Sequence, residues 1–212
     1  KIAASFSNWY LDVSSVLDTG NNFTVTEMSM ESPTGVVVPV TFSAGRSAAV
    51  ANGTTDVKSD EILATAFSGY TKFGRGEIWW LKGIISVPSL GGYVPYTTIT
   101  TAEYSGTQQV GYSSAATTPS STDVAGQYTV ASGAAFTTIN VPRPILLGRP
   151  LSDGKSYFVV GDSIADGQGD DATANGIYGR GFIARAMSNY GANPYPCLIA
   201  AKPGAESLAF SS

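Results

Sequence analysis

The 212 residues carry a formal net charge of -4, and only 13% of them are charged, with the basic residues scattered along the chain, so we expect no surface that tracks nucleic-acid phosphates. The single cysteine and the absence of histidine exclude an internal disulfide, a cysteine-based zinc site and chemistry by an imidazole of this chain. No apolar run approaches the roughly 20 residues that a membrane-spanning helix requires, so we expect no membrane partner.

Residues 1–150 are expected to form an all-β domain, because short apolar runs alternate with turn signals. The expected strands are residues 23–28, 36–42, 77–85 and 136–141. The expected turns, rich in Gly, Pro and Asn, are residues 19–22, 32–35, 52–53 and 90–92. Regular spacing of these signals without an amphipathic helix predicts a β-sandwich or jelly-roll-like domain.

Two features of this β region leave alternatives open. The stretch from Thr97 to Gly133 is rich in Thr, Ser, Ala, Gly and Tyr, which fits either a long hairpin or a flexible loop. Trp79 and Trp80 could stack on sugar rings if exposed, although packing in the core is the favoured interpretation. We expect the β domain to serve for attachment or for glycan contact.

The pattern changes after Pro150, and residues 151–212 are expected to begin an α/β domain. Tyr157–Val160 is a wholly apolar run, typical of a parallel strand buried on both faces. An apolar stripe over Gly176–Tyr190 predicts a helix, and Pro196–Ala201 is interpreted as a second buried strand. These elements are expected to form a β-loop-α-β unit with parallel strands and a right-handed crossover, within a multidomain chain of the α+β class.

The loop after Val160 carries the residues that point most directly to chemistry. Ligands collect beyond the carboxyl ends of parallel strands, and Gly161, Asp162 and Ser163 come directly after this strand. Gly204, with Ser207 close behind it, follows the second strand in the same way. Over residues 155–212, this pair of segments resembles the first two motif blocks of the SGNH (GDSL-type) serine hydrolases.

The resemblance implies a flavodoxin-like α/β fold and a serine esterase. Ser163 would be the nucleophile, the backbone N–H groups of Ser163 and Gly204 would stabilise the oxyanion, and Gly161, Asp162 and Ser207 would have supporting roles. A serine at the end of a buried strand has a rigid support. Removing one oxyanion donor typically lowers the rate on the order of 100-fold to 1000-fold.

Other interpretations of this loop are weaker. Asp166, Gln168 and Asp170 alternate like the early ligands of an EF-hand, but Ile177 occupies the position that needs a bidentate Glu. A G-x-G-x-x-A pattern beginning at Gly167 starts well past the strand and includes acidic residues that would repel a pyrophosphate. We therefore expect neither a metal nor a cofactor.

The chain departs from the SGNH pattern in the later blocks. The family also uses an asparagine in a third block and an Asp-x-x-His near its C-terminus, whereas these 212 residues contain no histidine and end soon after the second block. A serine without a general base is a poor nucleophile. We expect the chain to be nearly inactive alone and, since it does not begin with Met, to belong to a longer polypeptide.

The β region resembles, more loosely, the β domains that precede SGNH modules in some bacterial and phage proteins, on Phe23–Thr26, Val38–Phe42 and Ser59–Asp60. This resemblance implies an extracellular or virion-associated esterase that acts on an ester such as the O-acetyl groups of a polysaccharide. Low charge and the Ser, Thr and Gly content also fit a non-catalytic fibre, spike or decoration component, with other virion or surface proteins, or further copies of the chain, as partners. The sequence leaves both functions open.

Overall fold

The computed structural model describes residues 1–11, 16–74, 77–89, 92, 94–95, 122–126, 144–149, 156–166, 183 and 197–201. The chain separates into two compact units. The first comprises Lys1–Tyr10, Leu17–Thr98 and Gln108–Arg149, and the second comprises Leu11–Val16, Ile99–Thr107 and Pro150–Ser212. Because the second unit includes segments from the first half of the chain, this division is not identical to the expected domains 1–150 and 151–212, which stay a prediction.

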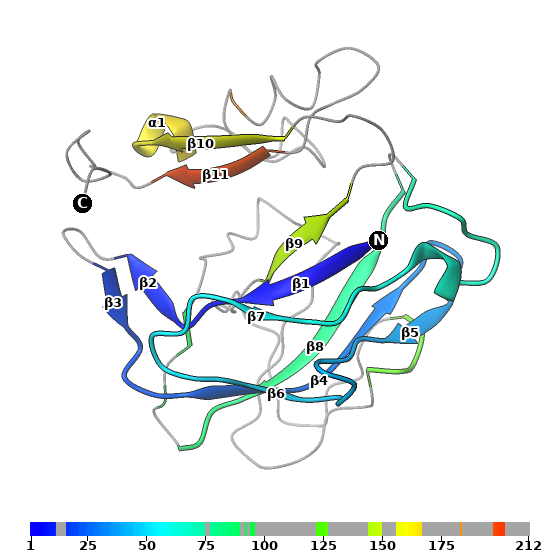
Figure 1. The fold of residues 1–212 in the computed structure, drawn as a ribbon, viewed down its shortest axis with the longest axis horizontal. Helices are drawn as coiled ribbons and strands as arrows, with labels where there is room; N and C mark the ends of the chain where they lie inside the picture. The colour runs from blue at the N-terminus through cyan, green and yellow to red at the C-terminus, as the bar shows by residue number, and fades with distance from the viewer. Residues whose placement is uncertain are drawn as a thin grey trace. The chain divides into compact units, whose positions relative to one another are not determined.

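The largest sheet of the first unit is built on β4 (Phe23–Glu31), as Figure 1 shows. β8 (Trp80–Ser86) pairs antiparallel along almost the whole of β4. β5 (Val37–Pro39) and β6 (Ala48–Val50) pair antiparallel with the two ends of β4. β4 is therefore the central strand, and its side chains decide what lies on each face of the sheet.

A β-bulge in β4 determines on which face of the sheet its side chains lie. The register with β8 shifts between Val25 and Glu27, so that Thr26 is an extra residue on this strand. A bulge of this kind interrupts the strict alternation of faces. Val25 and Met28 therefore both lie in the hydrophobic core, although they are three positions apart.

A second sheet has β1 (Ile2–Phe6) at its centre, with β7 (Val57–Lys58) on one side and β9 (Ile145–Gly148) on the other, both antiparallel to it. β2 (Trp9–Leu11) and β3 (Val16–Asp18) form a separate two-stranded sheet. A 3-10 turn, η1, spans Ala64–Ala66. The two larger sheets, built on β4 and on β1, are thus antiparallel.

One hydrophobic core joins side chains from both larger sheets and from the loops. Its fully buried large members are Phe6, Phe23, Phe67, Val25, Val40 and Val50. The rings of Phe6 and Phe23 meet edge to face with centroids 6.4 Å apart, a favourable arrangement for aromatic quadrupoles. β1 and β4 therefore bury their apolar faces in the same core.

Three of the expected strands are present, with shifted bounds: residues 23–28 lie within β4, residues 36–42 contain β5, and residues 77–85 overlap β8. Residues 136–141 lie outside the described residues. The expected turns are supported by positive φ at Gly20, Gly35 and Gly53, which a glycine adopts without a steric penalty. The prediction of a β-rich chain is confirmed. The strands that were not predicted are β1, β2, β3, β6, β7 and β9.

In the second unit, β10 (Tyr157–Gly161) and β11 (Cys197–Ala201) pair in parallel. A short helix, α1 (Ser163–Asp166), follows β10. Of the helix expected at 176–190, only Ile183 belongs to the described residues, and it is helical. The crossover connection lies outside the described residues, so the full β-loop-α-β unit stays a prediction.

The expectation that the strand at 157–160 is buried on both faces is wrong. Tyr157, Phe158 and Val160 expose 41%, 66% and 45% of their surface. The physical reason is the small size of the sheet: within the described ranges β10 has β11 as its one neighbouring strand. A wholly apolar run indicates burial only when further strands and helices cover both of its faces.

Candidate functional site

The turn between β10 and α1 contains the motif residues Gly161, Asp162 and Ser163. β10 ends at Gly161, Asp162 forms a bend, and Ser163 is the first helical residue. The Oδ1 atom of Asp162 accepts a hydrogen bond from the backbone N–H of Ile164 at 2.9 Å. Asp162 thereby acts as the N-cap of α1, because it satisfies an N–H group that has no partner within the helix.

Gly161 is required by close packing at this turn. A Cβ atom at position 161 would lie 2.3 Å from the Cβ of Ala165, far inside the contact distance of two carbon atoms. Ala165 itself is only 8% exposed, so the first turn of α1 folds back over the end of β10. The backbone of Ser163 is therefore held at the end of the strand between a glycine contact and an aspartate cap.

The end of β11 lies beside the same turn. In the parallel register Gly161 stands opposite Ala201, the last residue of β11. The chain therefore leaves both strands at one edge of the sheet. Gly204 and Ser207 follow β11 and lie outside the described residues, and Ser163 is described by its backbone, so the structure places the start of each motif segment and not the side chains.

A buried polar network on β4 and β8 is the feature that sequence reasoning missed. Ser29 and Glu31 of β4 and Lys82 of β8 are at most 7% exposed, and Lys82 Nζ donates to Glu31 Oε2 at 2.8 Å. Glu27, Ser29 and Glu31 alternate along one face of the strand, opposite Met28 and Met30 in the core. That alternation of polar and apolar residues over 27–31 is the signal that could have revealed the network.

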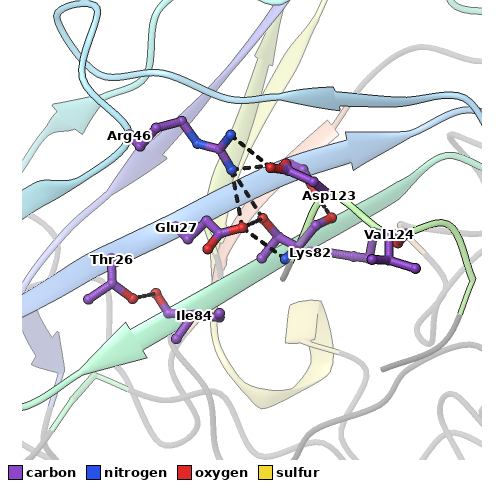
Figure 2. A network of polar contacts seen from close by, with 9 residues as sticks. Thr26, Glu27, Arg46, Lys82, Ile84, Asp123 and Val124 are labelled. Atoms are coloured by element: carbon purple, nitrogen blue, oxygen red, sulfur yellow. Dashed lines mark hydrogen bonds and ion pairs between the residues drawn. The ribbon is translucent and has the colours of Figure 1, made fainter. Parts of the chain in front are cut away.

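This network binds the segment Thr122–Gly126, as Figure 2 shows in part. Arg46 of the first unit contributes a bidentate contact, from Nη1 to Asp123 Oδ2 at 3.1 Å and from Nη2 to Asp123 Oδ1 at 3.0 Å. The hydrogen bond to Asp123 raises the pKa of Arg46 above its ordinary value. Arg46 also approaches Glu27, with Nη2 3.2 Å from Oε1.

A second carboxylate, Asp60, stabilises a tight turn in the first unit. Phe42 and Gly45 exchange two backbone hydrogen bonds across Ser43 and Ala44, whose φ angles are 49° and 66°. Positive φ at both central positions defines a type I′ turn, which usually takes Asn or Gly there. Asp60 accepts hydrogen bonds from Ser43 N and Ala44 N and from the Thr41 hydroxyl.

The hydrogen bond from Thr41, together with those from the turn, lowers the pKa of Asp60.

Within the part of the chain that the structure describes, no three His, Cys, Asp or Glu side chains gather in a way that could hold a metal ion. No helix among those same residues combines the length and the apolar character needed to cross a bilayer.

Comparison with known proteins assigns no family to the chain. No protein-family model matches it, and no curated protein sequence matches it. The resemblance to SGNH hydrolases therefore rests on the motif residues themselves, Gly161, Asp162 and Ser163 after β10 and Gly204 and Ser207 after β11.

Proposed function

We propose that this chain carries the first part of an SGNH-type serine esterase, with Ser163 as the nucleophile. The observation that supports the proposal is the parallel pairing of β10 with β11, in which Gly161 stands opposite Ala201. Each motif segment begins at the carboxyl end of one of these neighbouring strands, where α/β proteins collect their ligands.

The distances along the chain are compatible with a shared oxyanion site. Gly204 follows Ala201 by three positions, and three extended residues reach at most about 11 Å. Neighbouring strands lie about 4.8 Å apart, so the N–H of Gly204 can approach the N–H of Ser163. A glycine leaves room for a substrate oxygen beside its backbone, which is the property that an oxyanion donor at this position needs.

In the proposed reaction, the Ser163 hydroxyl attacks an ester carbonyl and a histidine takes its proton. Since the 212 residues contain no histidine, this base comes from polypeptide outside them. The oxyanion accepts hydrogen bonds from the N–H groups of Ser163 and Gly204, the alcohol leaves with the proton, and water then hydrolyses the acyl-serine. The substrate class that we propose is O-acetyl groups on a polysaccharide, contacted through a β-sandwich formed by residues 1–150, in an extracellular or virion-bound protein.

Two experiments test this function. Mass spectrometry of the natural polypeptide determines whether it extends past Ser212 with an Asp-x-x-His segment. If it does, we expect that polypeptide to hydrolyse p-nitrophenyl acetate and the Ser163→Ala variant to lose at least about 1000-fold in kcat.

Ser156→Ala is the matched control, because Ser156 is an exposed serine just before β10 and its loss should leave the rate unchanged. Equal rates for Ser163→Ala and the unmodified protein would disprove the esterase proposal.

The second candidate function is a non-catalytic structural or attachment component of a virion or cell surface. It is favoured by the antiparallel β-structure of the first unit together with a chain that has only 13% charged residues and no histidine. Under this alternative the protein purifies with particles and has no esterase activity, whether or not the polypeptide extends past Ser212. An active polypeptide that loses activity with Ser163→Ala would exclude it.

A further inference from the structure

We propose that residues Thr122–Gly126, which we call the strap, detach from the β4–β8 sheet in an opening step that does not unfold the sheet. The strap crosses the polar face of this sheet, and Figure 2 shows part of its attachment. The proposal rests on how the strap is held, on what it buries and on what its release would uncover.

In the described part of the chain, side chains and not a strand ladder hold the strap. Glu27 accepts a hydrogen bond from Thr122 N at 2.9 Å, and Ser29 Oγ donates to the Thr122 carbonyl. Lys82 Nζ donates to the Val124 carbonyl. Among the described residues, no backbone-to-backbone hydrogen bond joins the strap to the sheet.

The far end of the strap is fixed in the same manner. The N–H of Gly126 donates to both carboxylate oxygens of Glu31, at 3.1 and 3.0 Å. The two ends are thus held by Glu27 and Glu31, which lie on one face of β4. Arg46 makes a bidentate contact with Asp123 of the strap, which we call the outer clamp. The Arg46 and Asp123 side chains are 36% and 45% exposed, so water can compete for this clamp.

Release of the strap exposes little apolar surface. Val124 is already 61% exposed, Asp123, Ala125 and Gly126 are also exposed, and Thr122 is the buried member. A segment with few buried apolar contacts opens at a lower free energy than the strands beneath it. The hydrophobic core, on the opposite face of β4, loses nothing.

The surface uncovered by release consists of groups that water solvates well. The charged side chains facing the strap are Glu27, Glu31, Lys82 and Arg46, and Ser29 lies among them. Glu31 and Lys82 remain paired with one another after the strap leaves. Among the described residues, the buried pair of Glu31 and Lys82 stays intact, so the usual penalty for breaking a buried ion pair does not oppose the opening.

Amide hydrogen exchange of the chain under native conditions tests the proposal. We expect the amides of Thr122 and Gly126 to exchange at least about tenfold faster than the amides of β4. Asp123→Asn removes the outer clamp and should speed exchange at Thr122 and Gly126 about two- to fivefold, the range of an exposed ion pair, without changing β4. Glu61→Gln, which breaks the exposed pair of Glu61 with Lys1, is the matched control and should change neither.

The opposite results would overturn the proposal. Equal protection at Thr122, Gly126 and β4 would show that the strap and the sheet open as one unit. Acceleration of β4 and the strap by the same factor in Asp123→Asn would show the same thing. Acceleration of the strap by Glu61→Gln would show that the effect does not come from the clamp.

Discussion

At the scale of single residues, the exposed carboxylate of Asp60 stabilises a tight turn. Its carboxylate accepts two backbone N–H groups of a turn that has no glycine at either central position. Residues with a Cβ atom are strained in the left-handed region, so the turn needs an external acceptor to hold its N–H groups. Asp60 supplies that acceptor from a distant part of the chain.

The pH dependence of stability should report this role. Because hydrogen bonds lower the pKa of Asp60 in the folded protein, its contribution is complete above the unfolded pKa of about 3.9. The contribution is lost as the pH falls through the lower folded pKa. We expect Asp60→Asn to lower the urea midpoint at pH 7 and to have a smaller effect near pH 2.

Glu61→Gln is the neighbouring control for this experiment. Glu61 is an exposed carboxylate that pairs with Lys1, and its change should leave the urea midpoint nearly unchanged at pH 7. A pH-independent effect of Asp60→Asn would contradict a role for the ionised carboxylate.

At the scale of the elements, the junction of β10 and α1 depends on the absence of a side chain at Gly161. Gly161→Ala would place a Cβ atom 2.3 Å from Ala165 Cβ, and overpacking of this kind typically destabilises by about 1–3 kcal/mol. We expect the NMR signals of Ser163–Asp166 to shift or broaden in this variant. Gly148→Ala is the matched control, because its Cβ would meet Ile2 Cγ2 at 3.7 Å, an ordinary contact.

Removing one partner of the ion pair between β4 and β8 should destabilise the fold strongly, whereas replacing both partners should change the free energy of unfolding much less. The side chains of Lys82 and Glu31 are 8% and 10% exposed, so Lys82→Met leaves a buried carboxylate without its cation and should lower the free energy of unfolding by about 3–5 kcal/mol. The double variant Glu31→Gln with Lys82→Met should recover most of that loss.

Chemical denaturation of the two single variants and the double variant measures this coupling. Lys1→Met, in the exposed pair with Glu61, should cost at most about 1 kcal/mol. A double variant that is no more stable than Lys82→Met would contradict the argument.

The strands that could be predicted from the sequence are those that their own residues indicate. The strands that were missed depend on pairing with distant segments. β4 is visible because Phe23, Val25 and Met28 combine β-forming residues with a preceding turn at Gly20. β1 is short and uses Ala3, Ala4 and Ser5, residues without a strong strand preference, and it becomes a strand by pairing with β7 and β9. Pairing of that kind depends on distant segments, so a local pattern does not show it.

The candidate site was predictable in the same limited sense. The end of an apolar strand before Ser163 is a local signal, and the strand is present. The close approach of Gly161 and Ala165 depends on the path of the chain after the strand, so the residue types alone do not predict it. The roles of Ser163, Gly204 and Ser207 stay predictions.

At the scale of the whole molecule, the bulge in β4 decides whether a change of chain length is tolerated. Thr26 is the extra residue opposite β8. If it is deleted, Val25, Glu27 and Met28 alternate regularly, so the core residues keep their faces. We expect the chain without Thr26 to fold cooperatively, at a loss of about 1 kcal/mol from the hydrogen bond of Thr26 Oγ1 to the Ile84 carbonyl.

Deletion of Thr24 is the matched control, since it removes the same residue type from the regular part of the strand. It turns Phe23, which is 1% exposed, to the opposite face relative to Val25 and should cost about 3–5 kcal/mol. Thermal unfolding of both variants distinguishes them. Equal destabilisation by the two deletions would contradict the assignment of Thr26 as the bulge.

The manner in which the strap is held bears on how its sequence can vary among related proteins. The sheet binds the strap through the N–H of Thr122, the carbonyl of Val124 and the N–H of Gly126, atoms that almost every amino acid possesses. Val124 and Ala125 are therefore free to diversify, whereas Gly126, with a φ of 86°, is constrained by its backbone. An exposed segment that tolerates substitution while keeping its position is a suitable place for surface variation, including the exchange of an epitope.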